Sequence, residues 1–361
     1  MKNKYIFLSL LCPVVFLFFI SCEKEVEFKG DELDPLIVVN GIVTEGDTVA
    51  VLLTKSKSVF EEEYLYTFVT NAEVNLYVND VFAETLTPQK AEAWDTGELY
   101  DTGEYAGSVK AVAGKTYRLE IAVDGFDPIS CETTVPKPVE ILAWDTTSVG
   151  ETGYSGFASI TEFNVEFNDN GQQHNYYRIQ STSKGGRERI RYTPDGTMQY
   201  TDTIVIEPES SEWIDILNAQ LNDAINDADE FISGTPDNRF AIFKDDSFNG
   251  SKMKLRFQIR NNFYYYYPAM GSSNESDGNF RERNISLFSL SKEYYEYLNT
   301  ANLHYYFEDD FFSEPVQVYS NIKGGIGIWG AVARTSFSVL EGNYPLDDKV
   351  YVERDGYYYG Y

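Results

Sequence analysis

The feature that most constrains the fold is a two-residue alternation of apolar and polar side chains, which recurs along much of the chain. Its clearest example is the segment 253–260, where Met253, Leu255, Phe257 and Ile259 alternate with basic and polar residues. This period is that of a strand with one buried face. Tyr and Phe, which favour strands, number 28 and 24 in 361 residues. The sequence therefore predicts a mainly β protein.

Short strand patterns separated by turn signals fill the region after residue 34. The clearest are residues 36–44, 48–54, 74–78, 82–86, 117–123 and 129–135. Closely spaced short strands are typical of an immunoglobulin-like or transthyretin-like sandwich, which we expect over residues 35–137. Pro136 and Pro138 then predict a linker.

The remainder of the chain, residues 138–361, is also strand-rich but contains two stretches with helical spacing. Near 211–232, apolar residues recur at three- and four-residue steps. Near 291–303, Ser291 provides an N-cap for a second helix. We expect one larger domain here, an antiparallel β-barrel or sandwich with two helices packed against it.

The first residues have the form of a lipoprotein signal peptide. Residues 1–21 combine Lys2 and Lys4 with an apolar run that is shorter than the about 20 residues of a membrane-spanning helix. A small residue followed by Cys22 replaces the usual Ala-x-Ala cleavage site. We expect cleavage before Cys22, acyl chains on its sulfur, and a membrane tether over residues 22–34. The alternative is an uncleaved anchor.

The charge of the chain limits its partners. The formal net charge of −28 disfavours binding to nucleic acid, because the phosphate backbone would be repelled. The acidity also has a simpler explanation, which is the solubility of an exported protein.

The cysteine and histidine content argues against disulfide and zinc chemistry. Cys12 leaves with the signal peptide and Cys22 carries lipid, so Cys131 remains alone. Strand alternation places Cys131 on an apolar face, as a buried inert thiol. With two scattered histidines, His174 and His304, the sequence predicts no zinc site and no cofactor.

Several motifs together resemble a known family. They are Val39-Asn-Gly41, Asn175–Arg178, Phe243–Gly250, Ser289–Leu298, and Glu314–Asn321 running into Ile322–Gly330. The chain resembles the Bacteroidota outer-membrane lipoprotein family described as domain of unknown function 4249. Members are usually encoded beside a TonB-dependent receptor, so the resemblance implies an outer-membrane location and a receptor partner. It implies no catalytic residue.

The charged cluster after the lipidation site adds to this resemblance. Glu23, Lys24, Glu25 and Glu27 follow Cys22 directly. This cluster is similar to the surface-export signal of Bacteroidota lipoproteins, which implies that the protein faces the cell exterior.

One acidic segment is a candidate calcium site. Asp95, Glu98, Asp101 and Glu104 recur at three-residue steps, and hard cations bind several oxygens. The alternative interpretation is a loop at a hairpin tip. The repeated motif Asp-Thr-Gly, at 95–97 and again at 101–103, favours this alternative.

Two glycine-containing motifs imitate ligand-binding loops. Gly324–Gly327 is followed by strand-like sequence rather than a helix, so we expect close backbone packing or a bulge instead of a phosphate loop. Asp245–Gly250 resembles the start of an EF-hand, but Arg256 occupies the position of the required Glu. We expect a turn that leads into the 252–260 strand.

Two tyrosine runs are a candidate binding surface. Tyr265 and Tyr267 in one run, and Tyr358 and Tyr359 in the other, would present ring faces and hydroxyls to a protein or a sugar. The alternative is cross-strand packing within the domain.

These observations leave three functional hypotheses. The first is a non-enzymatic, surface-exposed lipoprotein that assists a TonB-dependent receptor or captures its ligand. The second is a cell-surface glycan-binding module. The third is a hydrolase that uses an acid pair, although no pair can be selected from the sequence.

Overall fold

The fold was analysed in a computed structural model. It describes residues 34–58, 67–93, 96–153, 156–192, 194–195, 198–206, 209–222, 237–260, 280–307, 316–342 and 350–353. Residues 36–56 and 63–361 belong to one compact unit, and all that follows concerns this unit.

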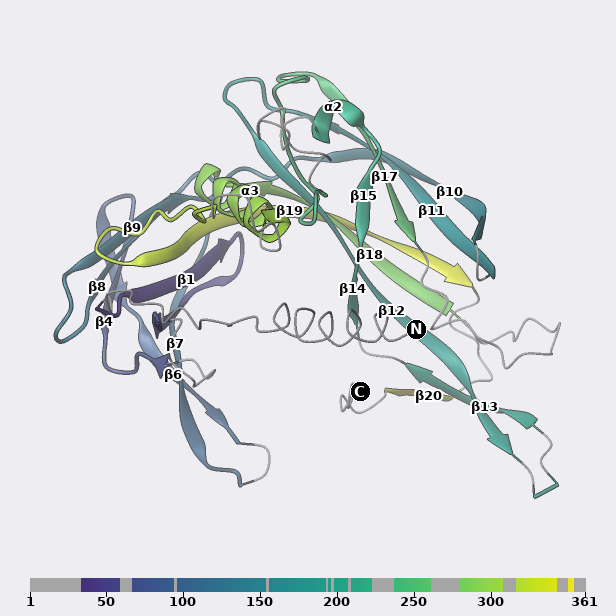
Figure 1. The fold of residues 1–361 in the computed structure, drawn as a ribbon, viewed down its shortest axis with the longest axis horizontal. Helices are drawn as coiled ribbons and strands as arrows, with labels where there is room; N and C mark the ends of the chain where they lie inside the picture. The colour runs from purple at the N-terminus through teal and green to yellow at the C-terminus, as the bar shows by residue number, and fades with distance from the viewer. Residues whose placement is uncertain are drawn as a thin grey trace, which may run out of the picture. The chain divides into compact units, whose positions relative to one another are not determined.

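Most of the described residues lie in three sheets (Figure 1). The large sheet contains β1 (Ile37–Thr44), β2 (Thr48–Lys55), β3 (Thr67–Phe68), β6 (Thr87–Glu92), β7 (Leu99–Lys110), β12 (Tyr176–Tyr192), β13 (Met198–Ile206), β14 (Ser210–Glu212), β16 (Ile242–Lys244), β18 (Phe280–Leu290), β19 (Ile326–Gly342) and β20 (Val350–Glu353). The β4 sheet contains β4 (Glu73–Val78), β5 (Val81–Thr85), β8 (Thr116–Ala122) and β9 (Ile129–Thr134). The β11 sheet contains β10 (Ile141–Gly153), β11 (Gly156–Asn168), β15 (Ile214–Ile216) and β17 (Lys252–Arg260).

The large sheet is the layer that the other two sheets share. Its main strand order is β20-β13-β12-β18-β19-β1-β2-β7-β6, which does not return to its start among the described strands. The sequence predicted a barrel or a sandwich. The described residues form open sheets that pack on one another, as in a sandwich, and not a closed barrel. The predicted mainly β class with antiparallel sheets and two helices is confirmed. Strands from before and after the predicted linker at residue 137 belong to this one large sheet.

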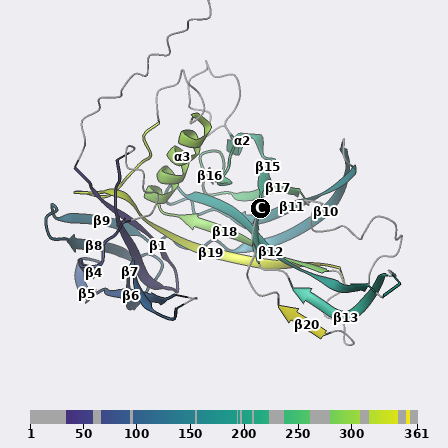
Figure 2. The ribbon, with the colours of Figure 1, turned by 60° about the horizontal axis from the view of Figure 1, so that its bottom comes forward.

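Each smaller sheet encloses its own hydrophobic core against the large sheet. The β4 sheet packs on β1, β2 and β7, as Figure 2 shows, around a core that includes Leu53, Leu119 and Trp329. The β11 sheet packs on β12 and β18 around a core that includes Phe163, Phe257 and Leu287. The strict alternation over 252–260 is confirmed, because β17 buries every second side chain.

Helix α3 (Lys292–Phe307) covers part of the large sheet against β19, β12 and β16. Tyr295 and Leu298 of the helix form a third core with Leu290 and Val332. The predicted N-cap is confirmed, since Ser291 Oγ accepts a hydrogen bond from Tyr294 N at 3.3 Å. The helix continues four residues beyond the predicted end at 303.

The helix predicted near 211–232 is wrong over its first part. Residues Ser210–Glu212 and Ile214–Ile216 are the strands β14 and β15, and the helix α2 spans only Ala219–Asn222 before the described residues end. The reason is tertiary pairing. Ile214 and Ile216 lie opposite Ile259 and Phe257 of β17, so two apolar residues at a two-residue step complete a sheet edge.

Glu212 of β14 pairs with a buried arginine of the large sheet. The Arg283 side chain is fully buried, and its Nε donates to Glu212 Oε1 and Oε2 at 3.1 and 3.0 Å. Another guanidinium nitrogen pairs with Glu341, and Ser181 Oγ donates to Glu212 at 2.7 Å. Because a buried charge is tolerated only when it is paired and hydrogen-bonded, this network joins β12, β14, β18 and β19.

A parallel pairing of β1 with β19 joins the two halves of the chain. It runs from Val38 opposite Ile326 to Thr44 opposite Val332. Gly327 has a φ of +117°, and a Cβ there would overlap the Val39 carbonyl. The expected close backbone packing of the glycine-rich segment is therefore confirmed.

The substitution Gly327→Ala tests this close approach. The backbone conformation alone costs about 1–3 kcal/mol for a non-glycine residue, and the overlap with Val39 adds to it. We expect a clear fall in the urea midpoint of unfolding of the detergent-solubilised full chain. The control is Gly46→Ala, where φ is +85° but no heavy atom lies within 4 Å of the added Cβ. Equal losses in the two variants would contradict the proposed role of the overlap.

Candidate functional site

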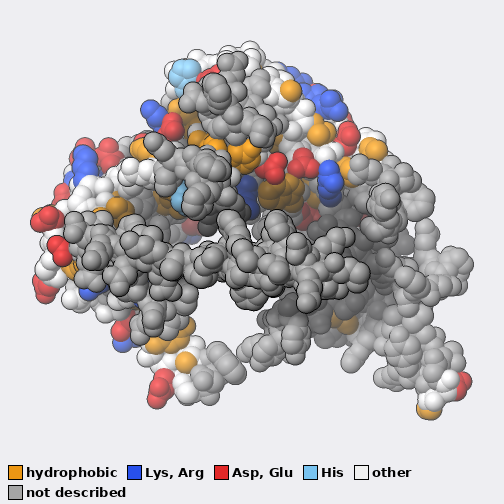
Figure 3. Space-filling model, in the orientation of Figure 1, with side chains coloured by type: hydrophobic (Ala, Val, Ile, Leu, Met, Phe, Trp, Pro, Cys, Tyr) orange, Lys and Arg blue, Asp and Glu red, His pale blue; other side chains and the backbone are white. Residues whose placement is uncertain are grey.

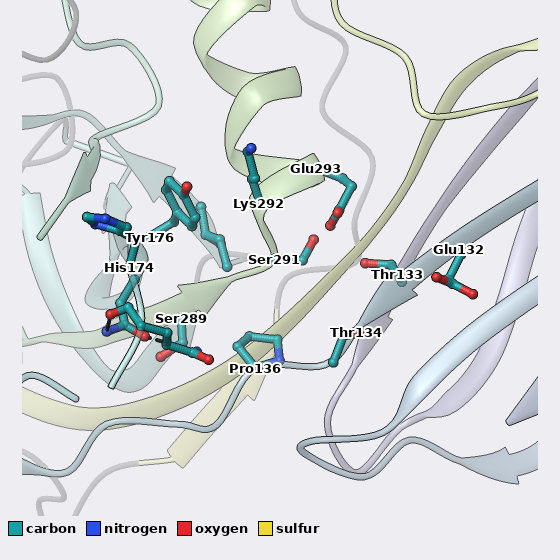
Figure 4. A pocket seen from close by; sticks show the side chains of 13 residues that line it. Glu132, Thr133, Thr134, Pro136, His174, Tyr176, Ser289, Ser291, Lys292 and Glu293 are labelled. Atoms are coloured by element: carbon teal, nitrogen blue, oxygen red, sulfur yellow. Dashed lines mark hydrogen bonds between the residues drawn. The ribbon is translucent and has the colours of Figure 1, made fainter. Parts of the chain in front are cut away.

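A polar pocket lies where the β4 sheet, the large sheet and helix α3 meet. Its volume is about 330 Å³. Figure 4 shows residues of β9, of the segment before β12, and of the start of α3 around the same space. The pocket is lined by Glu132, Thr133, Thr134, Pro136, Gln173, His174, Asn175, Tyr176, Ser289, Leu290, Ser291, Lys292 and Glu293.

Hydrogen bonds fix the walls of this pocket. Ser291 Oγ also accepts from Ala331 N at 3.1 Å, which fixes the start of α3 against β19. On the opposite side, Asn321 Nδ2 donates to the carbonyl of Glu132 at 3.2 Å and to that of Trp329 at 2.8 Å. The segment before β19 therefore holds both β9 and β19 in position.

Two buried hydroxyls lack partners at the pocket. Thr133 and Ser289 are 2% and 5% exposed, and neither Oγ atom has a hydrogen-bond partner among the residues that the structure describes. Figure 4 shows the hydroxyls of Thr133 and Ser291 turned toward the same space. Buried hydroxyls are normally hydrogen-bonded, so the Thr133 and Ser289 hydroxyls are polar groups of the pocket wall for which the described residues supply no partner.

The pocket also contains an aromatic ring. Tyr176 packs on Tyr295 of α3 with ring centroids 4.8 Å apart. Burial raises the pKa of the Tyr176 hydroxyl above its ordinary value, and nearby Glu296 adds to the effect. The ring is therefore held in place as a neutral, partly exposed surface.

A buried network of acids lies behind the pocket. Asn175 Nδ2 donates to Asp169 Oδ1 and to Asp245 Oδ2, each at 3.1 Å. Asp169 also accepts from Tyr177 Oη and from Gly250 N. Burial, and then the hydrogen bond to Asp169, raises the pKa of Tyr177. These contacts close the turn 245–251 onto the segment before β12, and the expected turn into β17 is confirmed.

At the side of the pocket, His174 lies beside Asp245 and Asp246. One ligand-capable atom from each lies within 4.8 Å of the others, and no other such group of His, Cys, Asp or Glu occurs in the described part of the chain. No local pattern relates the members of this group to one another, because its histidine and its two acids come from separate turns. Its only signals were the EF-hand-like segment and the rarity of histidine.

The three described acids of the candidate calcium site lie on or beside one strand. Asp95 lies outside the described residues. Asp101 and Glu104 belong to β7, which pairs with β6 as a hairpin, and Asp101 pairs with Lys90 at 3.4 Å. Glu98 precedes this strand. The calcium prediction is not supported by the three acids that are described.

Other predicted sites lie outside the described residues. They are the lipidation site Cys22, the export signal Glu23, Lys24, Glu25 and Glu27, and the tyrosines Tyr265, Tyr267, Tyr358 and Tyr359. In the described part of the chain, no helix has the length and apolar character needed to cross a membrane. On the face drawn in Figure 3, lysine and arginine side chains lie among the acidic ones.

The fold and the pocket define a class of protein, namely a β protein of three packed sheets with a polar pocket where two of the sheets and helix α3 meet. The chain belongs to the family described as "Domain of unknown function (DUF4249)", whose model matches residues 23–338. The resemblance inferred from the motifs is therefore confirmed at the level of the family. No curated protein matches the chain.

The buried position of Cys131 leads to a prediction about the reactivity of its thiol. Cys131 is buried and has no disulfide partner, and burial raises the pKa of its thiol to about 12. Because the thiolate is the reactive form, we expect no alkylation of Cys131 in the folded chain at pH 8. Rapid alkylation after unfolding in urea is the control, and mass spectrometry measures both. Labelling of the folded chain at the rate of the unfolded one would contradict this environment.

Proposed function

We propose that this protein is a surface-exposed outer-membrane lipoprotein that binds a ligand without transforming it, as an accessory or capture partner of a TonB-dependent receptor. The observation that carries the binding role is the polar pocket with the unpartnered hydroxyls of Thr133 and Ser289. The lipoprotein signal that ends at Cys22 supports the membrane location. The resemblance to outer-membrane lipoproteins encoded beside such receptors supports the partner.

The acids at the pocket favour binding over hydrolysis. Glu132 is exposed and Glu293 is partly exposed. The buried acids nearby, Asp169 and Asp245, are held by hydrogen bonds from Asn175 and do not line the pocket. A hydrolase that uses two carboxylates needs both of them at the scissile bond. In this pocket the two lining acids, Glu132 and Glu293, come from different elements, and neither carboxylate is buried.

The receptor partnership is tested by affinity purification of the full chain from detergent-solubilised outer membrane. We expect a large membrane barrel of the TonB-dependent class to copurify, identified by mass spectrometry. A different lipoprotein of the same membrane with the same tag is the control. Repeated recovery of this chain without a receptor would count against the proposed partnership.

A second candidate is a cell-surface glycan-binding module. It is supported by the combination of Tyr176 with amide and hydroxyl groups in one pocket, since sugars bind through aromatic faces and hydrogen bonds. The substitutions Thr133→Val and Ser289→Ala remove hydroxyls that have no partner in the described protein, so they should preserve folding.

On a glycan array, the full chain should then give a signal that falls in both hydroxyl variants. Thr48→Val, at an exposed position of β2, is the matched control and should retain the signal. A blank array would argue against the glycan candidate. An unchanged signal in both variants would place sugar binding outside this pocket.

A further inference from the structure

The group of His174, Asp245 and Asp246 contains a buried carboxylate oxygen with no hydrogen-bond partner. Asp245 is 0% exposed. Its Oδ2 atom accepts from Asn175 N at 2.9 Å and from Asn175 Nδ2 at 3.1 Å. Its Oδ1 atom accepts no hydrogen bond from any residue in the described ranges. A buried oxygen of a carboxylate is costly when it is left unpaired, so this atom requires a positive partner.

The atoms that face this oxygen are metal-ligand atoms. His174 Nδ1 lies 3.5 Å from Asp245 Oδ1 and 3.8 Å from Asp246 Oδ1. Both separations exceed the usual length of a charge-assisted hydrogen bond, about 2.7–2.9 Å. Two atoms bound to one tetrahedral zinc at about 2.0–2.1 Å lie about 3.4 Å apart. The observed spacing therefore fits atoms that share an ion better than atoms that bond to one another.

The surroundings hold each carboxylate in a suitable orientation. Asn175 occupies Asp245 Oδ2 and leaves Oδ1 toward His174. Lys244 pairs with Asp246 through Oδ2 at 2.8 Å, whereas Oδ1 is the atom near His174. Partners that fix the second oxygen of a ligating carboxylate are a regular feature of metal sites. One oxygen of each acid thus remains available on the side of His174.

The donor set indicates which class of ion would bind. Calcium and magnesium prefer oxygen ligands, whereas an imidazole nitrogen suits zinc and other first-row divalent metals. We propose that His174 Nδ1, Asp245 Oδ1 and Asp246 Oδ1 bind a divalent first-row metal ion such as Zn²⁺. Three protein ligands leave a fourth position of a tetrahedral ion for water or another ligand. His174 also lines the pocket, so this position is close to any molecule bound there.

The proposed ligands occupy separate turns that the fold brings together. His174 precedes β12, and the two aspartates follow β16, which pairs with β12. This explains why the sequence predicted no zinc site from its two scattered histidines. The proposal is independent of the receptor partnership, because it concerns only side chains of this chain.

The test is a calorimetric titration of the full chain with ZnCl₂. The chain is purified in detergent through a tag without histidine and is stripped of metal with a chelator. We expect saturable binding of one Zn²⁺ per chain. His174→Gln should weaken the binding by about tenfold or more, since even partners outside the first ligand sphere contribute that much. Asp246→Asn should have a similar effect.

The controls separate a metal site from general attraction to an acidic protein. The His174 and Asp246 side chains are 72% and 55% exposed, so the two variants should fold normally, which circular dichroism would verify. His304→Gln replaces the chain's other histidine and should leave the affinity for Zn²⁺ unchanged. An excess of Ca²⁺ should not compete.

Three outcomes would overturn the proposal. They are the absence of saturable Zn²⁺ binding, an unchanged affinity in His174→Gln, and displacement of Zn²⁺ by calcium at equal concentration. In the first case, His174 and Asp245 would form a simple charged pair. In the other two, the ion would bind through acidic residues elsewhere on the surface.

Discussion

The parallel pairing of β1 with β19 is the constraint on which the rest of the structure depends. The hydrogen bonds of this pair connect the hairpin of β1 and β2 to the long antiparallel unit of β12, β18 and β19. Gly41 and Gly327 permit it, because a Cβ at the first would meet the Trp329 ring and a Cβ at the second would meet the Val39 backbone. Trp329 then fills the first core, and its Nε1 donates to the Tyr117 carbonyl at 2.9 Å. One strand pair thereby positions both small sheets against a common layer.

The pocket follows from this arrangement. Strand alternation places Ser289 on the face of β18 that also carries Leu287, between the parts of the large sheet that each small sheet covers. Thr133 approaches from the β4 sheet, and His174 approaches from the chain that leaves the β11 sheet. Segments that carry the family resemblance meet here, among them Asn175–Arg178 and Ser289–Leu298. A polar space between two cores is therefore a product of the fold as a whole and not of any single loop.

Local patterns in the sequence predict much of the secondary structure but little of its assembly. The alternation of Met253, Leu255, Phe257 and Ile259 identifies β17, because one buried face leaves a period of two that needs no knowledge of partners. Ser291 identifies the start of α3, because capping is a local interaction. Ile214 and Ile216 mislead, because two apolar residues at this spacing fit a helix or a short strand until the edge of β17 is known.

Local patterns predict even less of the candidate site. Its members, including Thr133, His174, Asp245 and Ser289, are contributed by segments that no local rule relates to one another. In the sequence, Asp245 begins a segment that resembles an EF-hand but lacks the required Glu. Only the fold shows that the Asp245 carboxylate is buried against Asn175 and His174. The partnerless state of the Thr133 and Ser289 hydroxyls is likewise a property of packing, because nothing in the neighbouring sequence marks them.

The β1 and β19 pairing also has a consequence for the order in which the chain folds. The two strands are separated by most of the chain, so the first strand to emerge waits for one of the last before its free edge is covered. Contacts between such distant residues form slowly, and an uncovered strand edge attracts other chains in the meantime. A chain of this topology depends on protection by another factor, or on fast closure of the β1–β2 hairpin, until its last strands are available for pairing.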